Sequence, residues 1–228
     1  IDLGQMAVDG TVALTTNGNG AATIVNDAGL NFATSTVTGA LSATATTGDI
    51  TDSGNLAITG AATFITGATG SNIVLDSSGN VFSNSVEMKA GDGTAAFGNI
   101  TFVDSAGIDF ATSAGSNGDL YINSSTDGTV GGNLSVTATT GNITDTVAVV
   151  TTGSSTSSFT TSATNGTIEL NTPASLAGAV ALSTTGASGN ATIDNGTTAL
   201  NIAASSIGGN LTVTSGAGAG ITDSGTVT

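Results

Sequence analysis

One block of sequence occurs three times in this chain, beginning at Val37, at Val130 and at Ile207. Each copy contains a short stretch in which apolar and polar residues alternate, then a glycine turn, then an Ile-Thr-Asp unit. Short alternating stretches separated by glycine turns are typical of proteins built from stacked repeats. The repetition therefore predicts one continuous stack, not several separate globular domains.

A second unit recurs together with the first. It begins at Leu30, Ile108 and Leu200, and a shorter version begins at Ile1. We therefore treat the chain as a single β-solenoid segment with imperfect repeats. Its limits are 1–228 overall, with repeats at 1–36 (partial), 37–129, 130–206 and 207–228 (partial).

The copy that begins at Ile108 is followed by extra residues, which predict an insertion near 114–128. Tyr121, the only tyrosine of the chain, lies in this insertion between Leu120 and Ile122. Apolar residues on both sides of a polar one indicate a strand. We expect the insertion to form a small protruding hairpin or an extra pair of strands.

The alternation along the repeats has a period of two, which places every second side chain on one face of a strand. No stretch shows a helical period, and the Gly and Asn residues between strands permit tight turns. Three short strands per coil, repeated, predict an all-β fold, a right-handed parallel β-helix of roughly eight coils. The aromatic residues expected inside it are Phe32, Phe64, Phe110 and Phe159.

The charge balance excludes several classes of partner. The chain has 16 acidic residues and one basic residue, Lys89, and its formal net charge is −15. Nucleic acids and anionic membranes are bound through clusters of Lys and Arg, so neither is expected as a partner. No stretch approaches the roughly 20 consecutive apolar residues of a membrane helix, so no membrane insertion is expected.

Residues that carry common catalytic and metal chemistry are missing. The chain has no Cys and no His, which excludes thiol nucleophiles, disulfides and the usual zinc sites. Serine and threonine have no base to activate them. The near absence of Lys and Arg leaves trypsin-like proteases almost no cleavage site, which favours an extracellular location.

The units beginning at Gly208 and at Ile221 are Gly-Gly-Asn-Leu-Thr-Val-Thr and Ile-Thr-Asp-Ser-Gly. In these units the chain resembles the repeat shafts of large bacterial exoproteins, namely filamentous-haemagglutinin-type adhesins and autotransporter passengers. The resemblance implies a structural, non-catalytic shaft segment of a fibre that is extracellular or on the bacterial cell surface. It also implies a role in cell adhesion or biofilm, with a host, cell-surface or matrix glycan or protein as a possible partner.

Open sheet edges template further strands. We therefore expect the stack either to continue in a longer chain or to associate end to end with other copies as a filament. One alternative is a carbohydrate-binding or carbohydrate-cleaving β-helix, although the acidic residues are scattered and sugar-stacking aromatic platforms are lacking. A further alternative is an ice-binding solenoid, because Thr-x-Thr units such as Thr212–Thr214 recur.

The strongest candidates for a metal site are the aspartates of the three Ile-Thr-Asp units, Asp52, Asp145 and Asp223. Carboxylates in turns can collect calcium, which prefers several oxygen ligands. The competing interpretation is that each aspartate caps a turn with its own side chain. We favour capping, because the glycine-rich calcium-roll motif is missing, and we expect no other cofactor.

Eight Asn-x-Ser/Thr units raise the possibility of N-glycosylation. Turn asparagines followed by alternating threonines produce such units by construction, and we favour that origin. The eight asparagines are Asn99, Asn123, Asn133, Asn142, Asn165, Asn190, Asn195 and Asn210.

Overall fold

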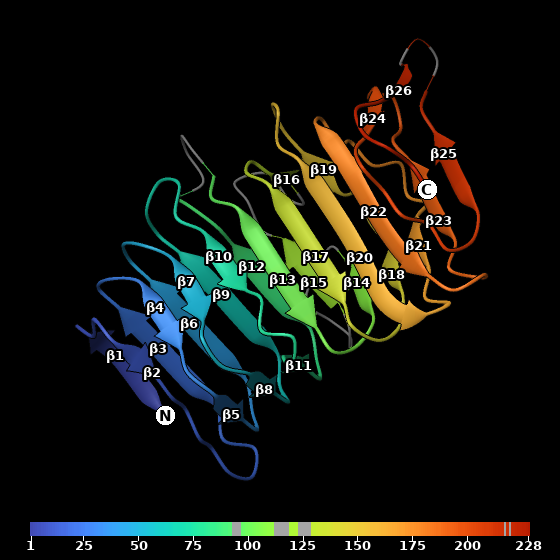
Figure 1. Cartoon of the computed structure of the whole chain (residues 1–228). Coiled ribbons are helices and arrows are strands. Elements are labelled where there is room, and N and C mark those ends of the chain that lie inside the picture. The colour runs from blue at the N-terminus through green and yellow to red at the C-terminus, as the bar shows by residue number, and fades with distance from the viewer. Residues whose placement is uncertain (93–96, 112–118, 123–128, 217, 219) are drawn as a thin grey trace.

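The structure is a computed structural model that describes residues 1–92, 97–111, 119–122, 129–216, 218 and 220–228. These residues form short strands and no helix. The strands stack along one axis, and the two chain ends lie at opposite ends of the stack (Figure 1). All strand pairs are parallel, and the chain makes about 9 turns, so the expected parallel β-helix is confirmed with one turn more than expected.

Sheet A is the largest side of the solenoid and has 11 strands. Apart from its edge strands β1 and β25, these strands bury alternate residues. In stacking order the strands are β1 (Asp2–Met6), β3 (Ala22–Asn26), β6 (Leu41–Ala45), β9 (Ala62–Thr66), β12 (Val86–Lys89), β15 (Asp119–Ile122), β14 (Ile108–Phe110), β18 (Ile143–Asp145), β21 (Ile168–Leu170), β23 (Ala191–Asp194) and β25 (Leu211–Thr214).

Sheet B is the second side and has 10 strands. In stacking order they are β2 (Thr11–Val12), β4 (Leu30–Phe32), β7 (Ile50–Asp52), β10 (Ile73–Leu75), β13 (Ile100–Asp104), β17 (Leu134–Ala138), β20 (Ser157–Thr164), β22 (Ala179–Thr185), β24 (Leu200–Ile202) and β26 (Ile221–Asp223).

Two short sheets occupy the remaining places around the axis. Sheet C has β5 (Ser35–Val37), β8 (Leu56–Ile58) and β11 (Val81–Phe82), which follow strands of sheet B along the chain, whereas sheet D has β16 (Thr129–Val130) and β19 (Val150–Thr151), which precede strands of sheet B. In other coils the side of sheet C is reduced to single bridges, such as Thr15 to Thr36 and Ser205 to Val227. The expected three strands per coil are therefore complete in only part of the stack.

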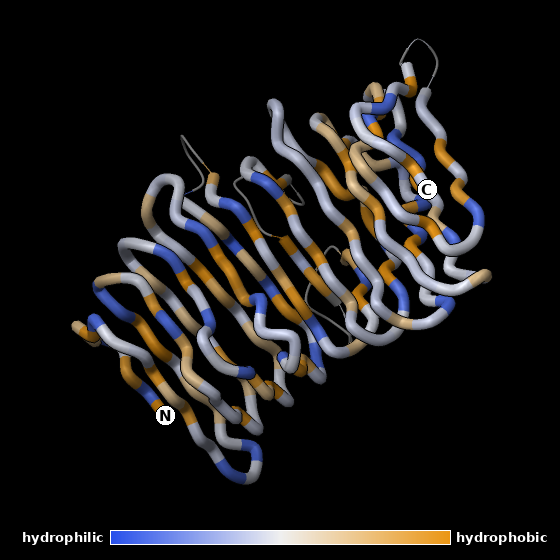
Figure 2. The backbone as a smooth tube through the Cα atoms, in the orientation of Figure 1, coloured by the Kyte–Doolittle hydropathy of each residue, from blue (hydrophilic) through white to orange (hydrophobic). Residues whose placement is uncertain are grey.

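The core is a set of apolar columns that run along the axis, and Figure 2 shows the matching alternation of hydrophobic and hydrophilic positions along the strands. All four phenylalanines expected inside are at most 3% exposed. Phe64 contacts Phe32 and Phe82 edge to face, with ring centroids 6.3 and 6.0 Å apart. Burial of this apolar surface is the main stabilising contribution.

The order in which the chain visits the sheets changes within the stack. From β3 to β12 the order is A, B, C, whereas from β17 to β21 it is B, A, D, B, A. From β23 the chain again passes from sheet A to sheet B. As a result, the second copy of the repeated block lies on the opposite sheets: β17 belongs to sheet B, while the equivalent strands β6 and β25 belong to sheet A.

The change begins at β13, which covers two strands of the coil before it. Ile100 to Phe102 pair with β10, and the Asp104 carboxylate accepts a 3.1 Å hydrogen bond from the Phe82 N–H of β11. Two short sides thereby become one longer strand. Sheet C ends at β11, and the strands that stack on β13 have five or more residues.

The insertion contributes one described strand, β15, which lies in sheet A between β12 and β14 and runs parallel to both. Leu120 and Ile122 are buried, as the alternation predicted. Within the described residues this strand belongs to the stack and not to a protruding hairpin. The neighbouring parts of the expected insertion, 112–118 and 123–128, lie outside the described residues.

Candidate functional site

The aspartates of the Ile-Thr-Asp units join one coil to the next. Asp52 ends β7, and its Oδ1 accepts a 2.9 Å hydrogen bond from the Asp76 N–H in the following coil. Its Oδ2 accepts hydrogen bonds from the Ser77 N–H at 3.3 Å and from Asn80 Nδ2 at 2.7 Å. Both oxygens are therefore used to cap the turn after β10, as the capping interpretation predicts.

Asp145 makes the equivalent contact one repeat later. Its Oδ1 accepts hydrogen bonds of 2.8 and 3.2 Å from the N–H groups of Asn171 and Thr172, which follow β21. Its Oδ2 is buried without a hydrogen-bond partner. Burial raises the pKa of Asp145, the two backbone N–H groups offset part of that rise, and the nearby charge of Asp109 adds to it. One oxygen of Asp145 therefore caps the turn after β21, and the other is buried.

The three candidate calcium residues do not come together. Asp52 and Asp223 end strands of sheet B, but Asp145 ends a strand of sheet A because the repeated block changes sheets. Asp223 is exposed. Within the part of the chain that the structure describes, no group of three or more acidic side chains could hold a metal ion.

A second set of polar side chains lies where a stack of paired strands is interrupted. These side chains form hydrogen bonds with backbone groups that lack a partner strand. Asn26, Asp104 and Asn195 occupy the fifth position of three related segments, and each is at most 2% exposed. Asn26 accepts from the Val8 N–H and donates to the Val8 carbonyl, at 3.0 and 2.9 Å. Asn195 does the same to Leu176, at 2.7 and 3.2 Å. Each amide replaces the peptide group of a missing strand, a role that the sequence analysis did not identify.

Asp104 is the exception among these three, because a carboxylate has no N–H to donate. Burial raises its pKa, and N–H groups of Phe82, Ala106 and Ser105 offset part of the rise. Its position in Ile100–Asp104 matches that of Asn26 in Ala22–Asn26, so alignment of the two segments could have identified this role.

Asparagines that precede strands form a ladder along the axis. The side-chain oxygen of Asn72 accepts from the Asn99 N–H, that of Asn99 from the Asn133 N–H, and that of Asn133 from the Thr156 N–H, each at 2.8 Å. Such a ladder joins consecutive coils outside the sheets. Several of the asparagines in Asn-x-Ser/Thr units therefore have a structural role.

The other asparagines of the Asn-x-Ser/Thr units lie in different surroundings. Asn195 is 0% exposed, so the folded chain does not present it to a glycosylating enzyme. Asn165 has a φ of 63° in a turn, and its Oδ1 accepts from the Ser188 N–H. The side-chain oxygens of Asn142 and Asn190 accept from the N–H groups of Thr167 and Asn210 in the next coil. Asn123 lies outside the described residues.

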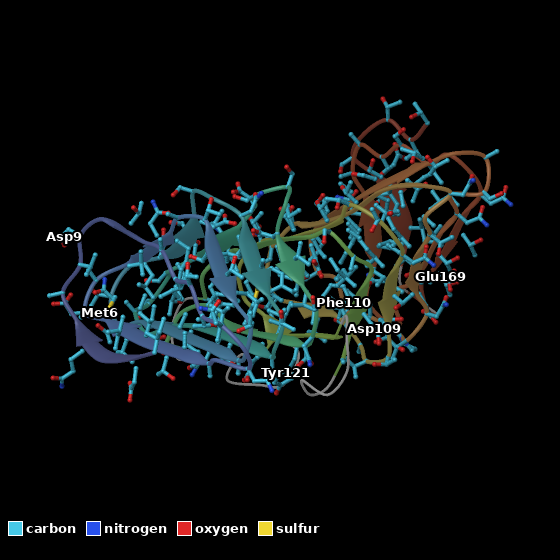
Figure 3. All side chains as sticks on the ribbon, turned by 90° about the horizontal axis from the view of Figure 1, so that it is seen from below. Met6, Asp9, Asp109, Phe110, Tyr121 and Glu169 are labelled. Carbon is cyan, nitrogen blue, oxygen red and sulfur yellow. The ribbon has the colours of Figure 1, made fainter. Side chains whose placement is uncertain are left out.

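Charged and aromatic side chains gather on the outer face of sheet A near its middle. Tyr121 of β15 is the register partner of Glu87 in β12, and Lys89 lies two residues after Glu87 on the same face. Figure 3 shows Tyr121 at the lower side of the stack, with Asp109 and Phe110 further towards the C-terminal end. This group is the one surface feature of the described residues that combines a ring, a carboxylate and an ammonium group.

One open hollow of the surface carries little chemistry. It lies towards the C-terminal end of the stack and is lined by hydroxyl and small apolar side chains, including Ser158, Thr160 and Ser183. Neither a carboxylate nor an aromatic ring contributes to it. Such a surface can donate and accept hydrogen bonds but provides no acid, base or nucleophile for a reaction.

The outer rows of the sheets contain hydroxyl groups with interruptions. Along sheet B one row of register partners passes through Asn31 and Val74 as well as threonines. An ice-binding surface would require an unbroken, evenly spaced row, so these interruptions do not favour it. From Thr11 the row continues through Asn31, Thr51, Val74, Thr101, Ser135, Ser158 and Ala181.

The described residues include no helix with the length and hydropathy needed to cross a membrane. Comparison with protein families gives one match: the model of the family described as "Repeats of unknown function (DUF5649)" fits residues 19–89 and 188–228. The chain is a repeat protein. No curated protein and no solved structure matches it.

The two matched segments correspond to a feature of the fold. Both lie where the chain passes from sheet A to sheet B and then to the side of sheet C, as from β3 to β12 and from β23 onward. The unmatched residues between them hold the coils in which the order is B, A, D.

Proposed function

We propose that the chain is a structural, non-catalytic shaft segment of a bacterial surface fibre that acts in adhesion outside the cell. The proposal rests on the hydrogen bonds that polar side chains form between successive coils. The carboxylates of Asp52 and Asp145 and the amides of the asparagine ladder hold successive coils together. A segment whose polar side chains fix the stack, and whose sheets continue along the axis, suits a mechanical element.

The distribution of basic residues supports an exposed location. Lys89 is the only basic residue of the chain and lies within β12, between β9 and β15 of sheet A. A strand paired on both sides does not enter a protease active site without local unfolding. The shaft is therefore expected to resist trypsin-like proteases, as a protein outside the cell must.

Immunogold labelling of intact producing cells, with antibodies raised against this chain, tests the proposal. We expect gold particles on the outer surface and along fibres, and we expect brief proteinase K treatment of intact cells to remove them. A cytoplasmic protein labelled in parallel serves as the control for cell integrity. Labelling seen only after the cells are made permeable would contradict the proposal.

Carbohydrate binding is a second candidate function, and the outer face of sheet A favours it. Tyr121 presents the only tyrosine ring of the chain beside the Glu87 carboxylate, and rings next to hydrogen-bonding groups suit sugar recognition. A glycan array probed with the wild-type chain and with Tyr121→Ala tests this function. Binding that is lost in the variant supports it, and equal signals from the two proteins would count against it.

A further inference from the structure

Charged side chains are unevenly distributed around the middle of the stack. The strands of sheet A there carry Glu87, Asp109 and Glu169, together with the single basic residue, Lys89. In sheet B, the strands β13, β17, β20 and β22 contain one ionisable residue, Asp104, which is only 2% exposed. The described turns that adjoin these four strands contain no Asp, Glu or Lys. One side of the solenoid is therefore uncharged, although the chain as a whole has a net charge of −15.

The outer side of these four strands, which we call the neutral face, consists of two rows of register partners. The rows keep register because β13 pairs with β17, and β17 with β20, over five consecutive residues. In Figure 1 these strands lie at the front of the stack. All members of the rows are short, half-buried side chains with hydroxyl or methyl groups, so the face is flat. One row is Thr101, Ser135, Ser158 and Ala181, and the other is Val103, Thr137, Thr160 and Ser183.

The charge of the molecule limits what this face can contact. Two copies with a net charge of −15 repel one another wherever their acidic sides meet. Across the neutral face, two copies can approach without opposing carboxylates and without removing water from a charged group, which is costly. None of its eight residues is aromatic, so it provides no ring on which a sugar could stack. A second neutral face fits best, because hydroxyl groups both donate and accept hydrogen bonds.

The size of the neutral face agrees with a weak and reversible contact. Four strands spaced about 4.8 Å apart span roughly 19 Å, and the 8 residues of β20 span roughly 26 Å along the strand. The face therefore measures at most about 500 Å², and two such faces together bury at most about 1,000 Å². This area is near the lower limit for a specific protein interface.

We propose that the neutral face docks on the neutral face of a second copy, so that two shafts associate side by side. Since both copies use the same patch, the contact has two-fold symmetry. The hydroxyl and methyl groups of one face lie against those of the other, and Asp109 and Glu169 of sheet A stay outside the contact. The proposal rests on the shaft function and adds its partner.

Sedimentation velocity over a range of protein concentrations tests this docking. We expect an equilibrium between monomer and dimer that shifts towards dimer as salt rises from about 0.05 M to about 0.5 M, because salt screens the repulsion between copies and the contact contains no ion pair to weaken. Ser135→Asp combined with Ser158→Asp places carboxylates on register partners in the middle of the face. This double variant should weaken association about tenfold or more, because like charges then oppose one another.

A matched control uses the outer side of sheet A. Ser42 and Thr63 are register partners there, so Ser42→Asp combined with Thr63→Asp adds the same charge and leaves the neutral face intact. At about 0.5 M salt this control should associate within about twofold of the wild type. Thermal unfolding of each double variant verifies that the fold is retained.

A mixing experiment tests whether both copies use the same face. Ser135→Lys combined with Ser158→Lys should also fail to associate with itself. Mixed with the Ser135→Asp, Ser158→Asp variant, it should form dimers of one copy of each, because opposite charges then face one another. Mixed with the sheet A control variant, it should form fewer dimers.

Two results would overturn the proposal. One is association that the aspartates at Ser135 and Ser158 do not weaken, because the copies would then meet through another surface. The other is a wild-type chain that stays monomeric at all concentrations and salt conditions. If that monomer bound a neutral glycan on an array and the aspartates abolished the binding, the face would belong to a glycan. Both results leave the shaft function standing, since surface labelling of intact cells tests that function separately.

Discussion

The carboxylate of Asp52 accepts a 2.9 Å hydrogen bond from the backbone N–H of Asp76, which lies 24 residues later in the chain and one coil further along the axis. The same contact joins Asp145 to Asn171. A unit that a sequence search would flag as a potential metal ligand thus acts as a connector between coils. The stability of the stack should therefore depend on these aspartates individually.

Replacing Asp52 with alanine should lower the free energy of unfolding by about 1–2 kcal/mol. The substitution leaves the N–H groups of Asp76 and Ser77 without their acceptor, and unmade hydrogen bonds are costly where water does not replace them fully. Urea denaturation measures the change. Asp52→Asn keeps one acceptor oxygen and should recover part of the loss. Equal stability of Asp52→Ala and the wild type would contradict the connector role.

Asp104→Asn should stabilise the protein at pH 7 by about 1 kcal/mol. The equivalent position is asparagine in two other segments, and there the amide both accepts and donates. Because burial raises the pKa of Asp104 above its usual 3.8, its ionisation weakens the folded state. The wild-type deficit develops as the pH rises from 3.8 through the folded-state pKa and is fully present above it.

The pH dependence of this variant provides its control. Denaturation curves at several pH values should show the difference between Asp104→Asn and the wild type shrinking as the pH falls, because the protonated acid can donate like an amide. Burial also raises the pKa of Asp145, but this residue is present in both proteins, so its titration should cancel in the comparison. A variant that is less stable than the wild type at pH 7 would refute this account of Asp104.

Phe64→Ala should destabilise the protein by about 3–5 kcal/mol, as expected for an aromatic side chain removed from a packed core. Phe64 is 0% exposed and lies between the rings of Phe32 and Phe82. Phe64→Leu keeps most of the volume and should cost clearly less. Chemical denaturation followed by circular dichroism measures both. A loss below about 1 kcal/mol for the alanine variant would mean that the column is loosely packed.

Millimolar calcium should leave the melting temperature unchanged, because a ligand raises it only by binding the folded state. Both oxygens of Asp52 and one oxygen of Asp145 already accept backbone or amide N–H groups. Differential scanning calorimetry with calcium and with a chelator checks this expectation. A rise of several degrees that saturates with calcium would revive the metal-site interpretation.

The fold class and the core could be predicted because both depend on local alternation. Period-two patterns place Leu120 and Ile122 inside and Tyr121 outside, whatever sheet the strand joins. Likewise, Phe32 and Phe64 occupy inward positions of their own strands. The structure has about 9 turns where roughly eight were expected.

The exchange of sheets between repeats could not be predicted from the repeats themselves. Leu134–Ala138 and Leu41–Ala45 have nearly the same sequence but lie in different sheets. Their positions depend on β13, which extends over two strands of the coil before it. The sequence of a later repeat does not indicate how long a strand in an earlier coil is. For the same reason the equivalence of Asp52 and Asp145 in sequence did not bring them to one site.

Paired cysteines test the stacking of coils most directly, because the chain contains no cysteine of its own. Thr101 and Ser135 are register partners in β13 and β17, so Thr101→Cys with Ser135→Cys should form a disulfide under mild oxidation. Val103→Cys with Ser135→Cys places the two cysteines two residues out of register on the same face, and this pair should stay reduced. Thiol quantification and mass spectrometry distinguish the two outcomes. A disulfide in the second pair and none in the first would contradict the stacking described.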